Sequence, residues 1–261
     1  MEIDKHSYLE KGYAVTEGVF SASELDFLRG VVEKLEERAL SGMEPELTAQ
    51  CVRERDLPTR KRGGVELDRQ QNAAFIIGDP TRFAPELLPF LTKPVLVDLV
   101  ADLLGTTDLI FHFANVTSKA PHIGSGISWH RDFPNNYISP VEPKMLRTMI
   151  CLDGEHNGAT VFLPGSHRTA DDEGAVGEEG RATSAVCTAG SVVAIHPLVL
   201  HGGAPNHSSE PRRNIVIQWG CNGVSISTNA RESLTGMTIE EARSSFQVSK
   251  IGASYTATRF R

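Results

Sequence analysis

The sequence predicts a mainly β fold with helical additions, in the form of a sandwich or jelly roll. From Asp108 onward, short segments rich in apolar, β-branched and aromatic residues are bounded by Gly, Pro, Asn or Asp, which is the pattern of strands. Loops separate these segments in place of regular helices, so antiparallel sheets are favoured over a parallel α/β sheet. The expected strands are 109–117, 145–152, 159–163, 191–195 and 214–219.

Two helices are expected in the N-terminal part of the chain. Ser21 and Glu24 have the spacing of a capping box, and apolar residues then recur at helical spacing until Gly42. A second helix is expected over 94–104, because proline stands at its start and Gly105 can end it. These helices should cover one face of a sheet.

The length and composition fit one domain. With 261 residues, of which 40% are hydrophobic, the chain can bury a substantial core. We expect a single domain over 1–261, in which 1–107 is a mostly helical framing segment with a lid loop and 108–261 forms the jelly-roll core. The four cysteines show no CxxC spacing, which indicates neither a zinc ribbon nor a redox dithiol.

The charge and hydropathy patterns argue against several kinds of partner. A net charge of −7 is opposite to the basic footprint of a nucleic-acid-binding surface. No apolar run reaches the length of a membrane span, and the first residues are too polar for a signal peptide. We therefore expect a soluble, cytoplasmic protein with a small-molecule partner, and the sequence leaves open whether it is a monomer or a homodimer.

Two polar runs are expected to be loops. The run 53–64 is basic and contains Pro58 and a glycine pair, and a solvated surface is the ordinary interpretation of such a charge run. The run 170–180 is acidic, contains glycine and has few apolar residues, so a mobile surface loop is expected there.

The pair His130 and Asp132 indicates a metal site. If this stretch is a strand, the two side chains share a face because they are one residue apart. An imidazole and a carboxylate are two members of the triad of two histidines and one carboxylate that binds non-haem Fe(II) and leaves positions open. His201 is the best third ligand, since it follows the apolar strand at 191–195 and stands at a glycine pair. His196 is the competing candidate.

Arg212 is a candidate for binding a co-substrate. A dicarboxylate that chelates iron at one end needs a planar, permanently charged partner for its far carboxylate, and arginine supplies one. Adjacent strand residues face opposite sides of a sheet, so only one of Arg212 and Arg213 can enter the site.

Three motifs together resemble the phytanoyl-CoA dioxygenase-like (PhyH) family of Fe(II)/2-oxoglutarate-dependent oxygenases. They are His130-x-Asp132, the run Gly-Ala-Thr-Val-Phe-Leu-Pro-Gly-Ser-His at 158–167, and His201-Gly-Gly-Ala-Pro-Asn followed by Arg212. The resemblance implies a double-stranded β-helix core, the jelly roll of cupin-like proteins, with Fe(II), 2-oxoglutarate and O2 at its mouth. The family spacing also selects Arg212 over Arg213.

The resemblance implies oxidation of a C–H bond in a small-molecule metabolite, with release of succinate and CO2. Hydroxylation is the expected outcome, while desaturation, epoxidation and rearrangement stay open. Asp132 disfavours halogenation, because related halogenases replace this carboxylate with a small residue. A β-sandwich binding protein, or a cupin-like protein with a non-catalytic metal, is the alternative class, and the presence of both Asp132 and Arg212 argues against it.

The remaining site residues come from strand parity and from the resemblance. The resemblance puts Thr117 and Met149 near 2-oxoglutarate, and it puts Gly203 where many relatives carry a serine. Arg147 shares a face with Met149, and a buried cation there needs an anionic or strongly polar partner. The loops 133–143 and 53–69 are expected to cover the site, since such loops often carry binding function. For a small polar or anionic substrate, the expected binding residues are Arg147, Phe133, Asn135 and Tyr137.

Overall fold

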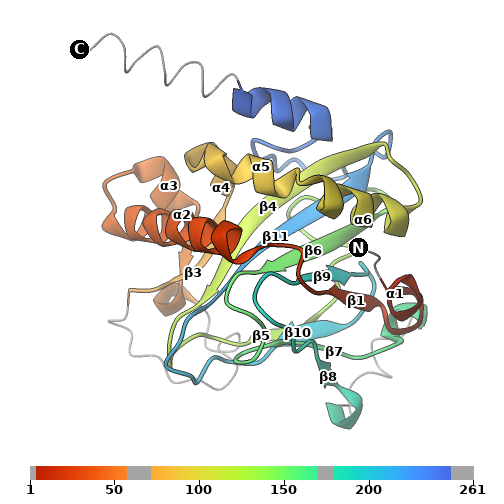
Figure 1. The fold of residues 1–261 in the computed structure, drawn as a ribbon, viewed down its shortest axis with the longest axis horizontal. Coiled ribbons are helices and arrows are strands. Elements are labelled where there is room, and N and C mark those ends of the chain that lie inside the picture. The colour runs from red at the N-terminus through yellow and green to blue at the C-terminus, as the bar shows by residue number, and fades with distance from the viewer. Residues whose placement is uncertain (1–3, 58–71, 170–178, 248–261) are drawn as a thin grey trace.

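Two antiparallel sheets form the core of the computed structural model, which describes residues 4–57, 72–169 and 179–247 (Figure 1). The seven-stranded sheet has the order β1 (Tyr13–Thr16), β9 (Val192–Ile195), β6 (Met145–Cys151), β11 (Arg212–Cys221), β4 (Leu109–Lys119), β3 (Ala74–Gly78), β2 (Cys51–Arg53). The four-stranded sheet has the order β5 (Ile127–His130), β10 (His201–Gly203), β7 (Thr160–Phe162), β8 (Thr183–Ser184). The predicted jelly-roll class is confirmed.

Helices cover the outer face of the larger sheet (Figure 1). They are α2 (Ala22–Ser41), α3 (Pro45–Ala49), α4 (Pro80–Phe83), α5 (Leu88–Leu91) and α6 (Pro94–Leu104), while α1 (Lys5–Lys11) lies beside β1. A further helix over 239–247 follows β11, and short 3-10 turns lie at 54–56, 85–87, 166–168 and 179–181. The capping box of α2 is confirmed, because Ser21 and Glu24 exchange side-chain and backbone hydrogen bonds, and Gly42 ends the helix at φ 75°. The predicted bounds of α6 are confirmed as well.

Buried apolar side chains form two clusters, one on each side of the larger sheet. The first joins α2, α5 and α6 to the strands, and fully buried residues such as Leu28 and Leu35 of α2 belong to it. Each such leucine stabilises the fold by about 2 kcal/mol relative to an exposed one. The second cluster lies between the sheets, where the rings of Tyr13 and Phe162 stack with centroids 4.1 Å apart. The second cluster therefore fixes how the two sheets face each other.

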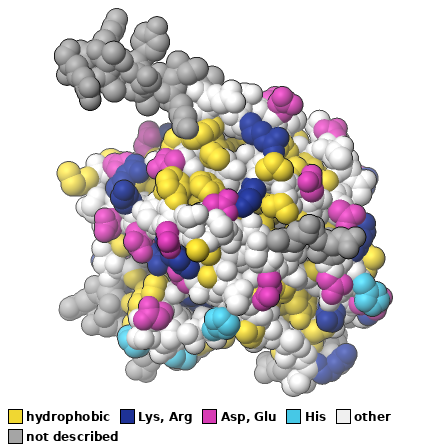
Figure 2. Space-filling view, viewed as in Figure 1, with side chains coloured by type: hydrophobic (Ala, Val, Ile, Leu, Met, Phe, Trp, Pro, Cys, Tyr) yellow, Lys and Arg dark blue, Asp and Glu magenta, His cyan; other side chains and the backbone are white. Residues whose placement is uncertain are grey.

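Three strands precede residue 108 and were not predicted. β1, β2 and β3 are short, and they lie at the two sides of the larger sheet. Most of the basic run lies outside the described residues, which include 53–57 but not 58–71, and the acidic run is likewise not described over 170–178. No helix of the described residues is long and apolar enough to span a membrane. On the face in Figure 2, acidic and basic side chains are dispersed among uncharged ones.

Candidate active site

His130, Asp132 and His201 come together at one place. Their nitrogen and oxygen ligand atoms all lie within 4.8 Å of one another. β5 and β10 pair so that His130 and His201 are direct cross-strand partners, and their ring centroids are 4.3 Å apart. Two ligands far apart in sequence are therefore brought together by one pair of short strands.

Both histidines present Nε2 to the centre of this cluster. Nδ1 of His130 donates to the carbonyl of Ser128 at 2.9 Å, and Nδ1 of His201 donates to that of Val199 at 3.0 Å. Such bonds fix the tautomer and leave Nε2 as the ligand atom. Burial lowers the pKa of His201 to about 4, so its ring is neutral and ready to bind a metal near pH 7.

Asp132 lies just beyond the end of β5, and not on the strand as predicted. β10 pairs with β5 only as far as His130, and the backbone N–H groups of Asp132 and Phe133 both donate to the carbonyl of Pro197 instead. The side chain still reaches the histidines: its Oδ1 is 3.5 Å from Nε2 of His130 and its Oδ2 is 3.7 Å from Nε2 of His201.

The charge of Asp132 is retained although the residue is buried. Burial by itself raises the pKa of this carboxyl, but the positive charge of Arg147, together with His201 and His130, holds the pKa well below its usual range. Neither carboxylate oxygen accepts a hydrogen bond of good geometry from the described residues. A buried, ionised carboxylate between two imidazoles fits a divalent iron, which would supply the missing partner.

His196 is not part of this cluster. Its ring lies against Tyr8 and His167, with centroids 5.6 Å and 4.7 Å away. Within the described residues, His130, Asp132 and His201 are the one group of three side chains that could hold a metal. The geometry therefore favours His201 over His196 as the third ligand.

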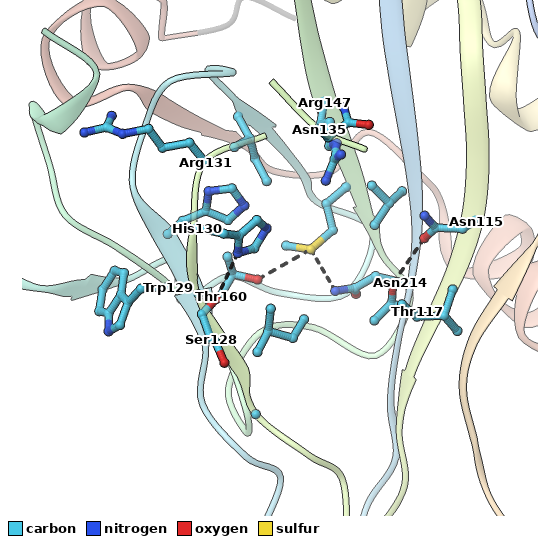
Figure 3. A pocket seen from close by; sticks show the side chains of 18 of the residues that line it. Asn115, Thr117, Ser128, Trp129, His130, Arg131, Asn135, Arg147, Thr160 and Asn214 are labelled. Atoms are coloured by element: carbon cyan, nitrogen blue, oxygen red, sulfur yellow. Dashed lines mark hydrogen bonds between the residues drawn. The ribbon is translucent and has the colours of Figure 1, made fainter. Parts of the chain in front are cut away.

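A cavity of about 570 Å³ opens beside the metal cluster (Figure 3). His130 and His201 of the smaller sheet line it on one side. The larger sheet contributes four of the predicted site residues, and the loop after β5 contributes one: Thr117, Arg147, Met149 and Arg212, with Asn135. Phe133 and Tyr137 are not among the lining residues, and the hydroxyl of Tyr137 donates to Glu232 instead.

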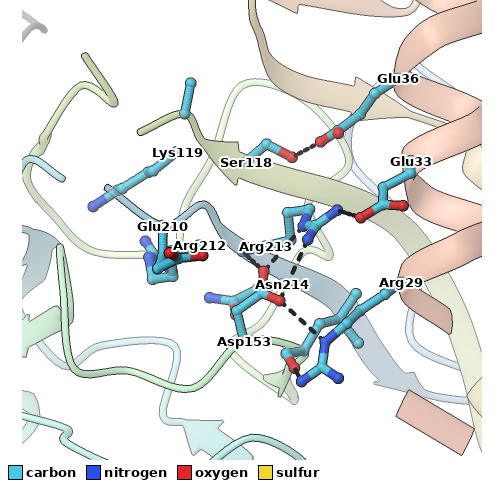
Figure 4. Close-up of polar contacts among 12 residues, drawn as sticks. Arg29, Glu33, Glu36, Ser118, Lys119, Asp153, Glu210, Arg212, Arg213 and Asn214 are labelled. Carbon is cyan, nitrogen blue, oxygen red and sulfur yellow. Dashed lines mark hydrogen bonds and ion pairs between the residues drawn. The ribbon is translucent and has the colours of Figure 1, made fainter. Parts of the chain in front are cut away.

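Arg212 and Arg213 face opposite sides of the larger sheet, as predicted. Arg212 lines the cavity, where its Nη1 lies 2.7 Å from Oε1 of Glu155 and its buried Nε has no hydrogen-bond partner among the described residues. Arg213 points toward α2 and pairs with Glu33 and Asp153 (Figure 4). One edge of the Arg212 guanidinium is thus held by protein, and the other edge can bind a carboxylate.

The sequence analysis missed Lys119 and Glu155, which are both buried beside Arg212. The side-chain nitrogen of Lys119 donates to the backbone carbonyls of Gly158 and Ala204, and burial lowers its pKa to about 6. A Cβ added at Gly203 would come within 2.8 Å of this nitrogen. Glycine at 203 therefore leaves the space that the end of the Lys119 side chain occupies.

Arg147 lies next to the metal cluster. It forms an ion pair with Oδ1 of Asp132, and its guanidinium carbon lies 5.2 Å from the centre of the Phe113 ring. Only 18% of the side chain is exposed. Arg147 faces inward, because it forms part of the cavity wall.

Comparison with known proteins agrees with this geometry. The family model described as Phytanoyl-CoA dioxygenase (PhyH) matches residues 8–214. The probable alpha-ketoglutarate-dependent hypophosphite dioxygenase of Stutzerimonas stutzeri is 26% identical over 235 residues, which cover 82% of this chain and 77% of that protein.

Solved structures share the fold at lower identity. EctD from S. alaskensis with 2-oxoglutarate and 5-hydroxyectoine has a TM-score of 0.69 at 20% identity, over 89% of this chain and 85% of that one. The alpha-ketoglutarate-dependent carbocyclase SnoK from nogalamycin biosynthesis has a TM-score of 0.66 at 19% identity, over 85% and 84%. Since the family match spans most of the chain, this protein belongs to the phytanoyl-CoA dioxygenase family and is an Fe(II)- and 2-oxoglutarate-dependent dioxygenase.

Proposed function

We propose that this enzyme hydroxylates a C–H bond of a small polar or anionic metabolite, using Fe(II) bound by His130, Asp132 and His201. The observation that carries the proposal is the meeting of these three side chains at a cavity that Arg212 also lines. Iron with 2-oxoglutarate and O2 supplies the oxidising power, and succinate and CO2 are released. The protein contributes binding, orientation and the exclusion of water.

Arg212 is the proposed anchor for the far carboxylate of 2-oxoglutarate. Its free guanidinium edge suits a bidentate carboxylate, while Glu155 keeps the other edge in place. Thr117 and Met149 are proposed to flank the co-substrate, since both line the same cavity. Asn214 supports Met149, because its side-chain amide lies 2.9 Å from the Met149 sulfur (Figure 3).

The substrate is proposed to lie against Arg147 and Asn135. A largely buried guanidinium next to the metal cluster favours a ligand with a negative or strongly polar group. The relative from Stutzerimonas stutzeri is named for hypophosphite, a small anion, which agrees with this class. Phe133 and Tyr137 are left out of the proposal, because they do not line the cavity.

The test is succinate formation from 2-oxoglutarate by the purified enzyme with Fe(II) and ascorbate. Candidate substrates that carry C–H bonds are added one at a time, beginning with ectoine and small carboxylic acids, and the product is analysed for an oxygen atom from 18O2. Stimulated succinate release with one labelled oxygen in the product supports hydroxylation. A product without the label would instead indicate desaturation or rearrangement, and an Asp132→Ala enzyme that is as active as wild type would contradict the metal site.

The cytoplasmic location and the oligomeric state stay predictions. Light scattering of the purified protein would decide between a monomer and a homodimer, and fractionation of the source cells would test the compartment.

A further inference from the structure

Arg147 is held by more than its ion pair with Asp132. Its Nε donates to Oε1 of Gln218 at 3.1 Å, and its Nη1 faces Asp132. Among the described residues, no hydrogen bond involves Nη2, and the side chain lies in the cavity wall. The Nη2 end is therefore available to a ligand, while the Nε end is fixed by Gln218.

Gln218 lies on β11 and is fully buried. Its amide nitrogen donates to the carbonyl of Ile138 at 2.7 Å and contacts Nδ1 of His112 at 3.0 Å. The orientation of this amide is determined by its partners, because a carbonyl requires a donor and the Nε of Arg147 requires an acceptor. A flipped amide would lose both bonds.

His112 on β4 completes the arrangement as a neutral acceptor. Burial lowers the pKa of His112 to about 4, so the ring carries one proton near pH 7. Because Nδ1 faces the donating amide of Gln218, that proton is on Nε2, which packs against Gly220. A Cβ on Gly220 would lie 2.0 Å from Nε2, so the ring occupies space that only a glycine at 220 leaves open.

Gln218 also contacts the loop that follows β5. The carbonyl of Ile138, which accepts from Gln218, is 3.4 Å from the amide nitrogen of Asn135, and that nitrogen donates to the backbone carbonyl of Asp132 at 3.0 Å. Gln218 therefore connects Arg147 with the loop that carries the second proposed substrate residue.

We propose that Gln218 is a positioning residue for substrate recognition: it holds Arg147 so that its Nη2 end meets an oxyanion group of the substrate beside the metal. This inference rests on the proposed function of Arg147. A neutral amide suits the task, because an acidic residue in its place would neutralise Arg147, and an apolar one would leave Nε unpaired in the core.

The experiment measures anion binding without turnover. Protein saturated with Mn(II), in place of Fe(II), and with 2-oxoglutarate is titrated with hypophosphite and with acetate in a calorimeter. Gln218→Met should weaken oxyanion binding about tenfold, since it removes a hydrogen bond to a charged group. The affinity for 2-oxoglutarate should change less than twofold, and Gln247→Met, the same change on an exposed helical residue, should alter neither.

A double-mutant cycle with Arg147→Lys separates positioning from packing. If Gln218 acts through Arg147, Gln218→Met should have less than a twofold effect in the Arg147→Lys background. An equal loss in both backgrounds would overturn the proposal, as would an absence of oxyanion binding to the wild-type complex. If Gln218→Met does not fold, Gln218→Asn takes its place in the cycle, because it keeps an amide that is too short to reach Nε. A wild-type protein that fails to bind 2-oxoglutarate would count against the proposed function itself.

Discussion

Replacing Arg212 with lysine should weaken the binding of 2-oxoglutarate without removing positive charge from the site. Nη1 of Arg212 pairs with Glu155, and its Nε is buried without a hydrogen-bond partner among the described residues. One edge of the guanidinium is therefore free to bind the co-substrate. A lysine retains the pair with Glu155 but loses at least one charge-assisted hydrogen bond to the co-substrate. Such a bond contributes about 1.5–3 kcal/mol, which corresponds to a roughly 10- to 150-fold rise in Kd.

Arg213→Lys is the matched control, because it makes the same change at the next residue on the other face of the sheet. Arg213 pairs with Asp153 and Glu33, and it does not line the cavity. Its replacement should lower the stability of the protein but leave the Kd for 2-oxoglutarate within about twofold. Calorimetric titration of 2-oxoglutarate into the Mn(II)-loaded variants gives both constants. Equal increases in the two variants, or a larger one in Arg213→Lys, would refute the reasoning.

Three further outcomes are expected. Alanine at any one of the three metal ligands should abolish Fe(II) binding in equilibrium dialysis, whereas His196→Ala should bind iron as wild type does, and the reverse result would make His196 the third ligand. Arg147→Ala should raise the KM for an oxyanion substrate at least tenfold while 2-oxoglutarate decay without substrate continues, and unchanged coupling would contradict its role. Burial raises the pKa of Glu232 from 4.5 to about 7, so the folded state binds this proton more tightly than the unfolded state. The stability from this group is complete below pH 4.5 and is lost as the pH rises to about 7, so urea unfolding of Glu232→Gln should show a flatter pH dependence over this range than wild type.

Local patterns in the sequence were sufficient to predict the longer elements. The capping box at Ser21 and the glycine at 105 each depend on contacts within a few residues, and both helices have the expected bounds. The strand predictions succeeded for the same reason, because β-branched runs between turn residues need no knowledge of the partner strand. β1 and β2 escaped prediction since they are short and take their stability from pairing with distant strands.

The candidate site was predictable where residue type and parity decide the geometry. Thr117, Met149 and Arg212 reach the cavity because side chains alternate along their strands. The alternation of side chains along a strand does not continue into a loop. For this reason the expectations that Asp132 lies on a strand and that Tyr137 lies at the substrate were wrong. Gln218 could not be predicted from sequence for another reason. Its proposed role depends on partners from two other strands and a loop, and none of these is near it in sequence.

The two metal-binding histidines and the proposed 2-oxoglutarate anchor belong to different sheets. His130 and His201 are on the smaller sheet, and Arg212 is on the larger one, so a co-substrate bound at both ends bridges the sandwich. The spacing of the sheets, which side chains such as Phe162 set, then determines the distance between the iron site and the carboxylate anchor. A change of one methyl group in this interior could misalign iron and 2-oxoglutarate in a protein that still folds, and activity would be lost at positions that touch neither ligand.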